Sequence, residues 1–424
     1  MGSEVESGRL WANRRFMVYL SGSTISGLGD AFFTLGVTWI IYITSHSLLQ
    51  TALIQVVGHL DRILLGPFTG AWADRHDRTM ILVISNIASG VFVGALAWIL
   101  GAPGHHLTTE LALASIVILN TLRTVGRPAV QSVLPDLVGI ELLVQANGWM
   151  SSINATVGMV GSALAGLVIA AWGTPNALGL DAVSFGVAAL AIILARFPKR
   201  LLETETTPAS PSHLWTDVRD GWRVLRGQPV LRTMVWLAAF VNIASFSGPL
   251  FVGLIREQWH AGAGAFGIFE GASSFGAILV SLRVASLERR FGAGRLLAGG
   301  WMVAGLAILG IAASHSALLG DGLALIFGVG VTVGQVAMGP LYELLVPADF
   351  RGRVWGITSA IATSAIPVSA VLGGWLADRY GPGLLIGISG AWLMAAAVMA
   401  IGVAAVREAR VSAVTDNATA SNSQ

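Results

Sequence analysis

Long apolar stretches recur along the whole chain and constrain its fold more than any other feature. A helix needs about 20 apolar residues to cross a bilayer, and charged or Gly/Pro-rich breaks separate twelve stretches of suitable length. Only 11% of the residues are charged, whereas a soluble domain has about 25%. The runs are continuously apolar, which excludes the alternating strands of a membrane β-barrel. The sequence therefore predicts an all-α membrane protein with twelve transmembrane helices. The predicted spans are approximately 16–42, 48–71, 79–101, 107–128, 147–171, 176–196, 230–256, 265–285, 295–314, 320–342, 354–376 and 383–404.

The distribution of basic residues predicts how these spans are oriented, because cytoplasmic loops are enriched in Lys and Arg. Alternate loops hold nearly all of the basic residues, whereas the intervening loops hold only Arg256 and Arg379. Both termini are therefore predicted to be cytoplasmic. The first span lacks the short apolar core and small-residue cleavage site of a signal peptide, so we expect it to be retained as a helix.

The longest polar stretch, residues 197–229, divides the chain into two six-helix halves. The predicted halves are residues 1–196 and 230–406. The stretch between them begins with the flexible sequence ETETTPASPS. Residues 407–424 form a polar tail that we expect to be disordered on the cytoplasmic side.

An amphipathic pattern occupies the second part of this polar stretch. Leu214, Val218, Trp222 and Leu225 share one helical face, with Arg side chains beside them. This pattern fits a helix that lies on the inner membrane surface. It fits a helix packed on the cytoplasmic ends of the bundle equally well.

Prolines and glycines recur between the two halves, which indicates an internal repeat. An offset of 212 relates Pro128 to Pro340 and Pro135 to Pro347, and an offset of 208 relates Gly148 to Gly356, Gly166 to Gly374 and Gly173 to Gly381. Two parallel six-helix repeats would place a substrate site near the membrane midplane, between halves that move against each other.

The loop after the second span carries the strongest local motif, GAWADRHDR at residues 70–78. It resembles the loop signature Gly-x-x-x-Asp-Arg/Lys-x-Gly-Arg of the major facilitator superfamily. Gly70, Asp74, Arg75 and Arg78 match that signature, whereas Asp77 stands where the family usually has glycine. We call the four matching residues the latch residues. The resemblance implies that they stabilise the outward-open state through interactions on the cytoplasmic side. The alternative is an ordinary charged loop.

Two other segments are related to this signature. GGWLADRYG, residues 373–381, fits it well but lies on the predicted outer side, so we interpret it as a helix cap. LERRFGAGR, residues 287–295, occupies the pseudo-symmetric position and has no aspartate.

Longer segments in both halves are similar to the bacterial efflux subfamily that includes macrolide, multidrug and siderophore exporters. These segments are residues 26–42, 66–75, 135–148 and 346–356. The resemblance implies two pseudo-symmetric six-helix halves and transport by alternating access. It does not imply a particular substrate.

Two spans partly resemble the signatures of drug/proton antiporters. Arg123 matches the arginine of the fourth-span signature, although that arginine could instead extend to the membrane interface. Gly158, Gly161 and Gly166 resemble the glycine signature of the fifth span, in which Ser162 replaces the proline. Small residues that let helices approach closely would explain these glycines equally well.

Ionisable residues within predicted spans are candidates for proton coupling, because a charge in a membrane is costly unless it has a function or a partner. The candidates are Asp30, Asp61, Arg62, Arg123 and Glu270. A carboxylate in an apolar cavity can bind and release a proton as access alternates, and Asp30 is the first choice for this carrier. Alternatively, Asp61 and Arg62 form static ion pairs.

The resemblance also implies that spans one, four, seven and ten line the substrate cavity. Aromatic side chains with scattered amides suit an amphiphilic organic ligand better than a sugar or a phosphate. Each candidate could instead be a packing residue. The candidates are Phe33, Thr34, Trp39, Asn242, Phe246 and Gln335.

Enzymes and nucleic-acid binders are disfavoured. The sequence has no nucleophile–base motif, no cysteine and no metal-spaced histidine cluster, since His105 and His106 are merely adjacent. No metal or cofactor is predicted. The net charge of +2 gives no basic face for nucleic acid.

The leading hypothesis is a monomeric, proton-coupled exporter of a hydrophobic or amphiphilic small molecule in a bacterial cytoplasmic membrane. Its predicted partners are this substrate, protons and membrane lipids. A lipid or lysolipid flippase of the same fold is the main alternative. An importer, a channel and a non-transporting sensor rank below it.

Overall fold

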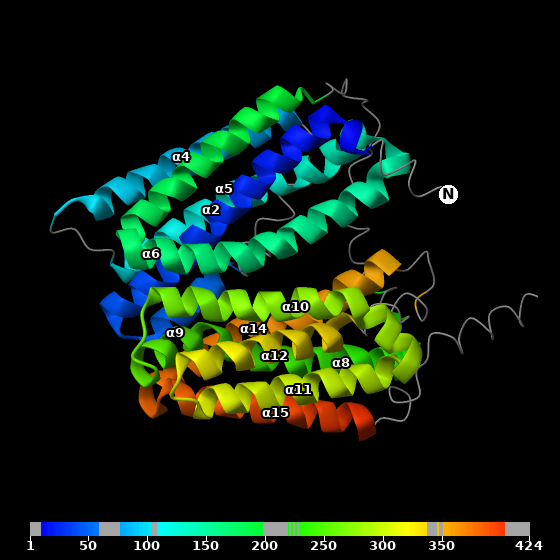
Figure 1. Cartoon of the computed structure of the whole chain (residues 1–424). Coiled ribbons are helices and arrows are strands. Elements are labelled where there is room, and N and C mark those ends of the chain that lie inside the picture. Colours follow the sequence, from blue (N-terminus) through cyan, green and yellow to red (C-terminus); the bar gives the residue numbers. More distant parts are fainter. Residues whose placement is uncertain are drawn as a thin grey trace, which may run out of the picture. The chain divides into compact units, whose positions relative to one another are not determined.

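A computed structural model describes residues 10–58, 77–103, 108–197, 219, 222–223, 225–227, 229–336, 346 and 351–402. All regular structure within these ranges is helical (Figure 1). The all-α prediction is thus confirmed for this part of the chain.

The helices of the N-terminal part are long and follow one another with short connections. They are α2 (Arg14–Ser45), the helix Leu48–Gly58, α4 (Arg78–Gly101), α5 (Thr109–Val138), the 3₁₀ turn η1 (Ile140–Leu142) and α6 (Leu143–Ala195). Both α2 and α4 pack against α6.

The C-terminal part begins with an irregular series of helices and continues with long ones. They are α8 (Pro229–Ile243), the 3₁₀ turn η2 (Ala244–Leu250), α9 (Phe251–Gly253), the π turn η3 (Leu254–Gln258), α10 (Ala263–Phe291), α11 (Ala293–Ala313), α12 (Ala317–Val336), α14 (Arg351–Tyr380) and α15 (Pro382–Gly402). Here α11 packs against α12 and α15, and α14 packs against α8.

The contacts divide the chain into two compact units. The first unit combines Met1–Leu202 with Ile255–Ser274, and the second combines Glu203–Leu254 with Phe275–Gln424. The segment Ile255–Ser274, which contains most of η3 and the start of α10, therefore packs with the first unit although it lies late in the sequence.

The helices follow the predicted spans along the sequence. Within the described ranges, nine helices are long and apolar enough to cross a membrane, and Leu48–Gly58 is a shorter apolar helix at the start of the predicted second span. The helix α5 covers the predicted fourth span and continues to Val138, where Gly139 with φ of 80° ends it. The total of twelve spans remains a prediction.

A kink, rather than a loop, separates the predicted fifth and sixth spans. Both lie in α6, which Gly173 interrupts with φ of 81° and ψ of 164°. Only glycine adopts this conformation without strain. Pro175 follows the kink, and its fixed φ suits the first turn of a helix.

The predicted seventh span is not one continuous α-helix. The α-helical part α8 ends at Ile243, and the chain continues through the 3₁₀ turn η2 and the π turn η3. Pro249 lies within η2 and has no amide proton to complete the α-helical hydrogen bonds. The predicted span is thus present as the apolar helical segment Leu231–Gln258, which is α-helical only in its first part.

Left-handed turns recur at equivalent places in the two halves. His46 after α2 and His260 after η3 have φ of 51° and 52°, and Gly173 and Gly381 have φ of 81° and 89°. Gly173 and Gly381 are a pair that the sequence offset of 208 had already matched. The backbone thus supports the internal repeat independently of the side chains.

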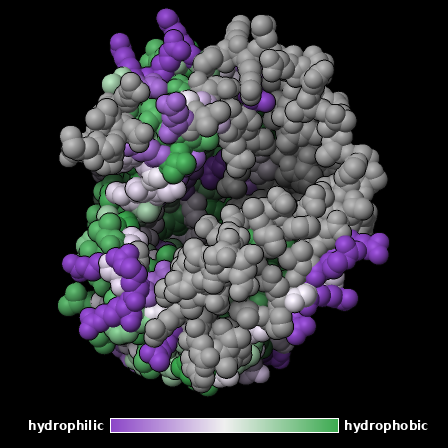
Figure 2. Space-filling view, turned by 90° about the vertical axis from the view of Figure 1, so that its right-hand side faces the viewer, coloured by the Kyte–Doolittle hydropathy of each residue, from purple (hydrophilic) through white to green (hydrophobic). Residues whose placement is uncertain are grey.

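Large apolar side chains lie on the surface of many helices. Trp98 is 79% exposed, and Leu318 is 84% exposed. Figure 2 shows hydrophobic residues at the surface beside groups of hydrophilic ones. Such exposure would be unfavourable in water, whereas lipid tails cover it without cost.

Glycines allow the backbones of α11 and α12 to come into contact. A Cβ atom on Gly300 would lie 2.5 Å from the amide nitrogen of Gly334 and 2.6 Å from the carbonyl oxygen of Gly330. Gly299, the preceding residue, has open space around the same position. Small residues at helix crossings are the usual means of close packing in membranes.

This pair of neighbours gives a matched test of the crossing. We expect Gly300→Ala to destabilise the protein by about 1–3 kcal/mol, because the methyl group forces the two backbones apart. Gly299→Ala should leave stability unchanged or raise it slightly. Thermal unfolding in detergent measures both, and equal effects of the two substitutions would contradict the packing argument.

Candidate functional site

An ion pair joins two spans of the first unit. A guanidinium nitrogen of Arg123, in α5, donates a hydrogen bond to a carboxylate oxygen of Asp30, in the middle of α2. Both side chains are partly exposed, Arg123 by 25% and Asp30 by 40%. Two residues that the sequence singled out separately therefore meet, and Arg123 makes a specific pair.

A third ionisable residue, Asp181 in α6, lies beside this pair. It is completely buried and interacts electrostatically with both Asp30 and Arg123. The hydroxyl of Ser184 donates a hydrogen bond of 2.7 Å to the backbone carbonyl of Asp181 and lies 3.3 Å from the Oδ1 atom of Asp181. Among the residues that the structure describes, none hydrogen-bonds the Oδ2 atom of Asp181. We call Asp30, Arg123 and Asp181 the charged cluster.

Packing fixes the positions of these three side chains. A Cβ atom on Gly29 would lie 2.4 Å from Asp181 Oδ1 and 2.1 Å from Ser184 Oγ, so the glycine lets α2 approach α6 closely. The guanidinium carbon of Arg123 lies 5.6 Å from the ring centre of Phe185, at a distance suited to a cation–π interaction. Phe185 is buried, and the aromatic contact limits where Arg123 can point.

The sequence reasoning missed Asp181, although the signal was present. Asp181 is the only charged residue between positions 176 and 196 apart from the terminal Arg196. A search for lone charges in every predicted span would have found it in the sixth. The proximity of Asp30 and Arg123 to Asp181 could not be predicted from the sequence, because the three residues lie on three separate helices.

Of the other candidates for proton coupling, only Glu270 belongs to the described residues. Glu270 lies in α10 and is half-buried. Asp61 and Arg62 lie outside the described residues.

The latch residues lie mostly outside the described residues as well, namely Gly70, Asp74 and Arg75. Arg78 is the first residue of α4. The preceding Asp77 accepts hydrogen bonds from the backbone amides of Thr79, at 2.8 Å, and Met80, at 3.1 Å. Asp77, which departs from the family signature, is therefore the N-cap of α4.

The look-alike segment 373–381 forms the end of a helix, as the sequence predicted. The helix α14 ends at Tyr380, and the amide of Gly381 donates a hydrogen bond of 2.9 Å to the carbonyl of Ala377. Gly381 has the positive φ that is typical of a residue following a helix.

The glycines of the fifth-span signature lie at helix contacts. Gly161 faces Ala31 of α2, and a Cβ atom there would lie 2.9 Å from the Ala31 methyl carbon. Gly166 faces the backbone of Gly267 in α10, where a Cβ would lie within 2.7 Å. Gly158 has open space. Close packing accounts for Gly161 and Gly166 without an antiporter role.

The predicted cavity residues differ in their surroundings. Phe33 is buried in an apolar cluster that includes Val37 and Ile41, and Phe246 is buried against Gly373. The remaining four are half-buried or exposed, namely Trp39, Asn242, Thr34 and Gln335. A substrate role for all six remains a prediction.

A second polar contact lies near the C-terminal end of α2. The hydroxyl of Tyr42, which is only 1% exposed, donates a hydrogen bond to a carboxylate oxygen of Glu257 in the π turn η3. This contact ties α2 to the segment Ile255–Ser274 of the same unit. No local sequence pattern indicates this contact, because the two residues are far apart along the chain.

A family model described as transmembrane secretion effector matches residues 11–424, nearly the whole chain. Macrolide efflux protein A of Streptococcus pyogenes is 22% identical over 396 residues, which cover 91% of this chain and 95% of that protein. The multidrug efflux pump Tap of Mycolicibacterium fortuitum is 25% identical over 408 residues, which cover 89% and 95%.

Solved structures show the same fold. The crystal structure of the nucleoside transporter NupG matches with a TM-score of 0.73 at 10% identity, over 92% of this chain and 98% of that one. The major facilitator fold that the sequence predicted is thereby confirmed.

The N-cap gives a test of what Asp77 does. We expect Asp77→Ala to lower stability by about 1 kcal/mol, because two amides at the start of α4 lose their acceptor. Asp77→Asn should keep the cap and leave stability unchanged. Thermal unfolding of the purified protein measures both variants, and equal losses for alanine and asparagine would show that the charge matters and the cap does not.

The charged cluster gives a second test, by a double-mutant cycle. We expect Arg123→Met to cost about 1–3 kcal/mol, because the carboxylates of Asp30 and Asp181 lose the guanidinium beside them. Adding Asp181→Asn removes one of these negative charges and should restore part of the stability. Thermal unfolding then yields a coupling energy of about 0.5–3 kcal/mol, and additive effects would show that Arg123 and Asp181 act independently.

Proposed function

Because the chain belongs to the family of transmembrane secretion effectors, within the major facilitator superfamily, we propose that it is a proton-coupled exporter. The substrate is a hydrophobic or amphiphilic small molecule, such as a drug, an antibiotic or a siderophore-like compound. The protein works by alternating access in a bacterial cytoplasmic membrane, as a monomer with both termini in the cytoplasm.

The charged cluster is the observation that carries this proposal. Two carboxylates lie beside the guanidinium of Arg123, and one of them, Asp181, is completely buried. An ionised carboxylate is costly inside a membrane, and binding a proton removes its charge. The cluster is therefore suited to exist in two states that differ by a single proton.

The proton changes the partner of Arg123. When Asp30 is ionised, Arg123 donates to it, as the structure has it. When a proton from the outside binds the Asp30 carboxylate, the attraction to Arg123 is lost and the guanidinium pairs with Asp181 instead. Release of that proton to the cytoplasm restores the first pair. Asp30 lies on α2 and Asp181 on α6, so the exchange changes which of these helices α5 holds.

The substrate class rests on the relatives and on the predicted cavity residues. Two relatives are named for macrolide efflux and for multidrug efflux. Aromatic and amide candidates such as Trp39, Asn242 and Phe246 suit such organic molecules. The latch residues, which include Arg78 at the start of α4, would favour the outward-open state from the cytoplasmic side.

Transport in proteoliposomes with an imposed pH gradient tests the proposal. We expect Asp30→Asn to reduce gradient-driven export at least tenfold while substrate exchange without a gradient persists, because the proton carrier is lost and the cavity is kept. Asp181→Asn should weaken gradient dependence as well, since Arg123 then has one carboxylate partner fewer.

Glu110→Gln is the matched control. Glu110 lies in the same helix as Arg123 but in its exposed first turn, so its loss should leave coupled export unchanged. Export that does not respond to the pH gradient in the unaltered protein would refute antiport, and full coupling in Asp30→Asn would clear Asp30 of the carrier role.

A further inference from the structure

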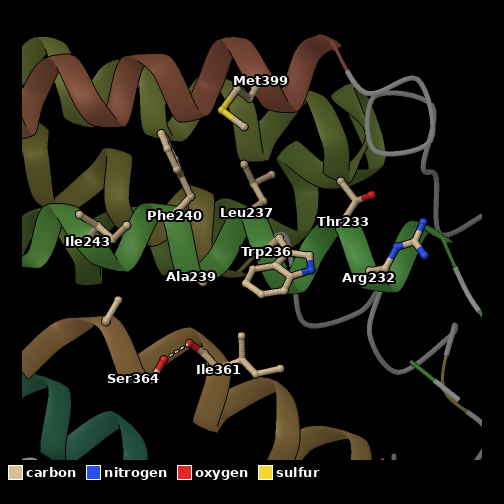
Figure 3. A pocket seen from close by; sticks show the side chains of 11 residues that line it. Arg232, Thr233, Trp236, Leu237, Ala239, Phe240, Ile243, Ile361, Ser364 and Met399 are labelled. Atoms are coloured by element: carbon tan, nitrogen blue, oxygen red, sulfur yellow. Dashed lines mark hydrogen bonds between the residues drawn. The ribbon is translucent and has the colours of Figure 1, made fainter. Parts of the chain in front are cut away.

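A pocket of about 690 Å³ lies in the second unit beside α8 (Figure 3). Apolar side chains from α8, α14 and α15 form most of its walls, and its size falls in the range of small-molecule sites. In Figure 3, Ile243, Phe240 and Leu237 follow one another along α8, with Met399 above them. An extended apolar chain fits such a wall.

Polar groups gather at one end of this row. Figure 3 places Thr233 and Arg232 on α8 beyond Leu237 and Trp236, at the start of the helix. A second pocket of about 380 Å³ shares Arg232 and Trp236 with the first and adds Arg226. The two pockets therefore adjoin, with Arg232 lining both of them and Arg226 lining the smaller one.

The segment before α8 forms the wall of the second pocket. Its Leu225 is buried in an apolar cluster with Leu231 and Val235. The guanidinium of Arg226 lies 5.3 Å from the ring centre of Trp222. For its described part, this favours the helix packed on the bundle over a helix free on the membrane surface.

Among the described residues, the positive charge of this end has no acidic counterpart. No carboxylate is among the described residues that line either pocket, and neither Arg226 nor Arg232 forms an ion pair with a described residue. Trp236 is 59% exposed, and tryptophan is enriched at the membrane–water interface. Apolar walls with arginines at one end complement an anionic amphiphile.

The basic-residue pattern predicts that this end of α8 faces the cytoplasm, where the membrane surface is rich in anionic lipids. We propose that the pocket binds an anionic phospholipid of the cytoplasmic leaflet. Its phosphate contacts Arg226 and Arg232, and one acyl chain lies along Leu237 and Phe240. The lipid thereby holds the segment before α8 against the bundle.

Lipid binding to the purified full chain in detergent tests this site, with phosphatidylglycerol and phosphatidylcholine titrated separately and detected by native mass spectrometry. We expect the unaltered protein to prefer phosphatidylglycerol. Each of Arg226→Gln and Arg232→Gln should weaken that binding about fivefold, and both together about 25-fold.

Arg290→Gln is the matched control, because Arg290 also lies 5.3 Å from an aromatic ring, that of Phe291, but lines neither pocket. It should bind lipid like the unaltered protein. Ala365→Trp fills the larger pocket without changing charge and should also abolish the preference, which shows that the acyl chain is needed.

Three results would overturn the proposal. They are equal binding of the two lipids, unchanged affinity in the double arginine variant, and displacement of the lipid by millimolar inorganic phosphate, which would mean that a free anion and no lipid is recognised. None of these measurements depends on transport, so they remain decisive even where proton coupling fails.

Discussion

The hydrocarbon core of the membrane is the constraint on which the rest of the structure depends. Without water, every backbone amide and carbonyl in a span must find its partner within the protein, and a helix satisfies them all. Since lipid tails are as apolar as the side chains, helices associate by close packing and not by the hydrophobic effect. The contact of Gly300 with the α12 backbone and that of Gly166 with Gly267 are therefore what hold these helices together.

The same constraint makes each charge inside a span costly unless it is paired or has a function. Asp30, Arg123 and Asp181 come from three helices, and the membrane tolerates them because they neutralise one another in part. Arg123 suits this position better than lysine would, because a guanidinium offers several fixed donors and packs on an aromatic ring, as it does on Phe185. The proposed proton coupling would act through this cluster.

The sequence predicted the helices well because each span is a local feature. Apolar runs, capping residues and basic loops can be read one segment at a time, and the ends of α2, α4 and α15 lie within a few residues of the predicted ones. Where the backbone departs from a regular α-helix within or between predicted spans, the cause is a single residue that changes backbone geometry. Gly173 bends α6 without ending it, and Pro249 turns part of the seventh span into a 3₁₀ helix.

The site was only partly predictable, for a different reason. Asp30 and Arg123 could be picked out as unusual, but their pairing depends on how α2 and α5 pack, which no local pattern encodes. Asp77 shows the opposite case, since an aspartate directly before an apolar helical run is a local signal for an N-cap, and the structure has it in that role.

The helix α2 connects two of the polar contacts found in the first unit. Asp30 and Tyr42 are separated by about 18 Å along its axis at 1.5 Å per residue. Tyr42 holds Glu257 in the π turn η3, which follows the irregular part of the seventh span. The helix α2 contains no proline, so no proline kink lies between Asp30 and Tyr42. A displacement of Asp30 along the helix axis therefore moves Tyr42 as well. In the proposed proton exchange, a change in the partner of Arg123 would act on a helix whose other polar contact lies next to the least regular segment of the described chain. A straight helix on one side of that contact and an irregular one on the other would, under this proposal, convert a local change in charge into a movement of helices.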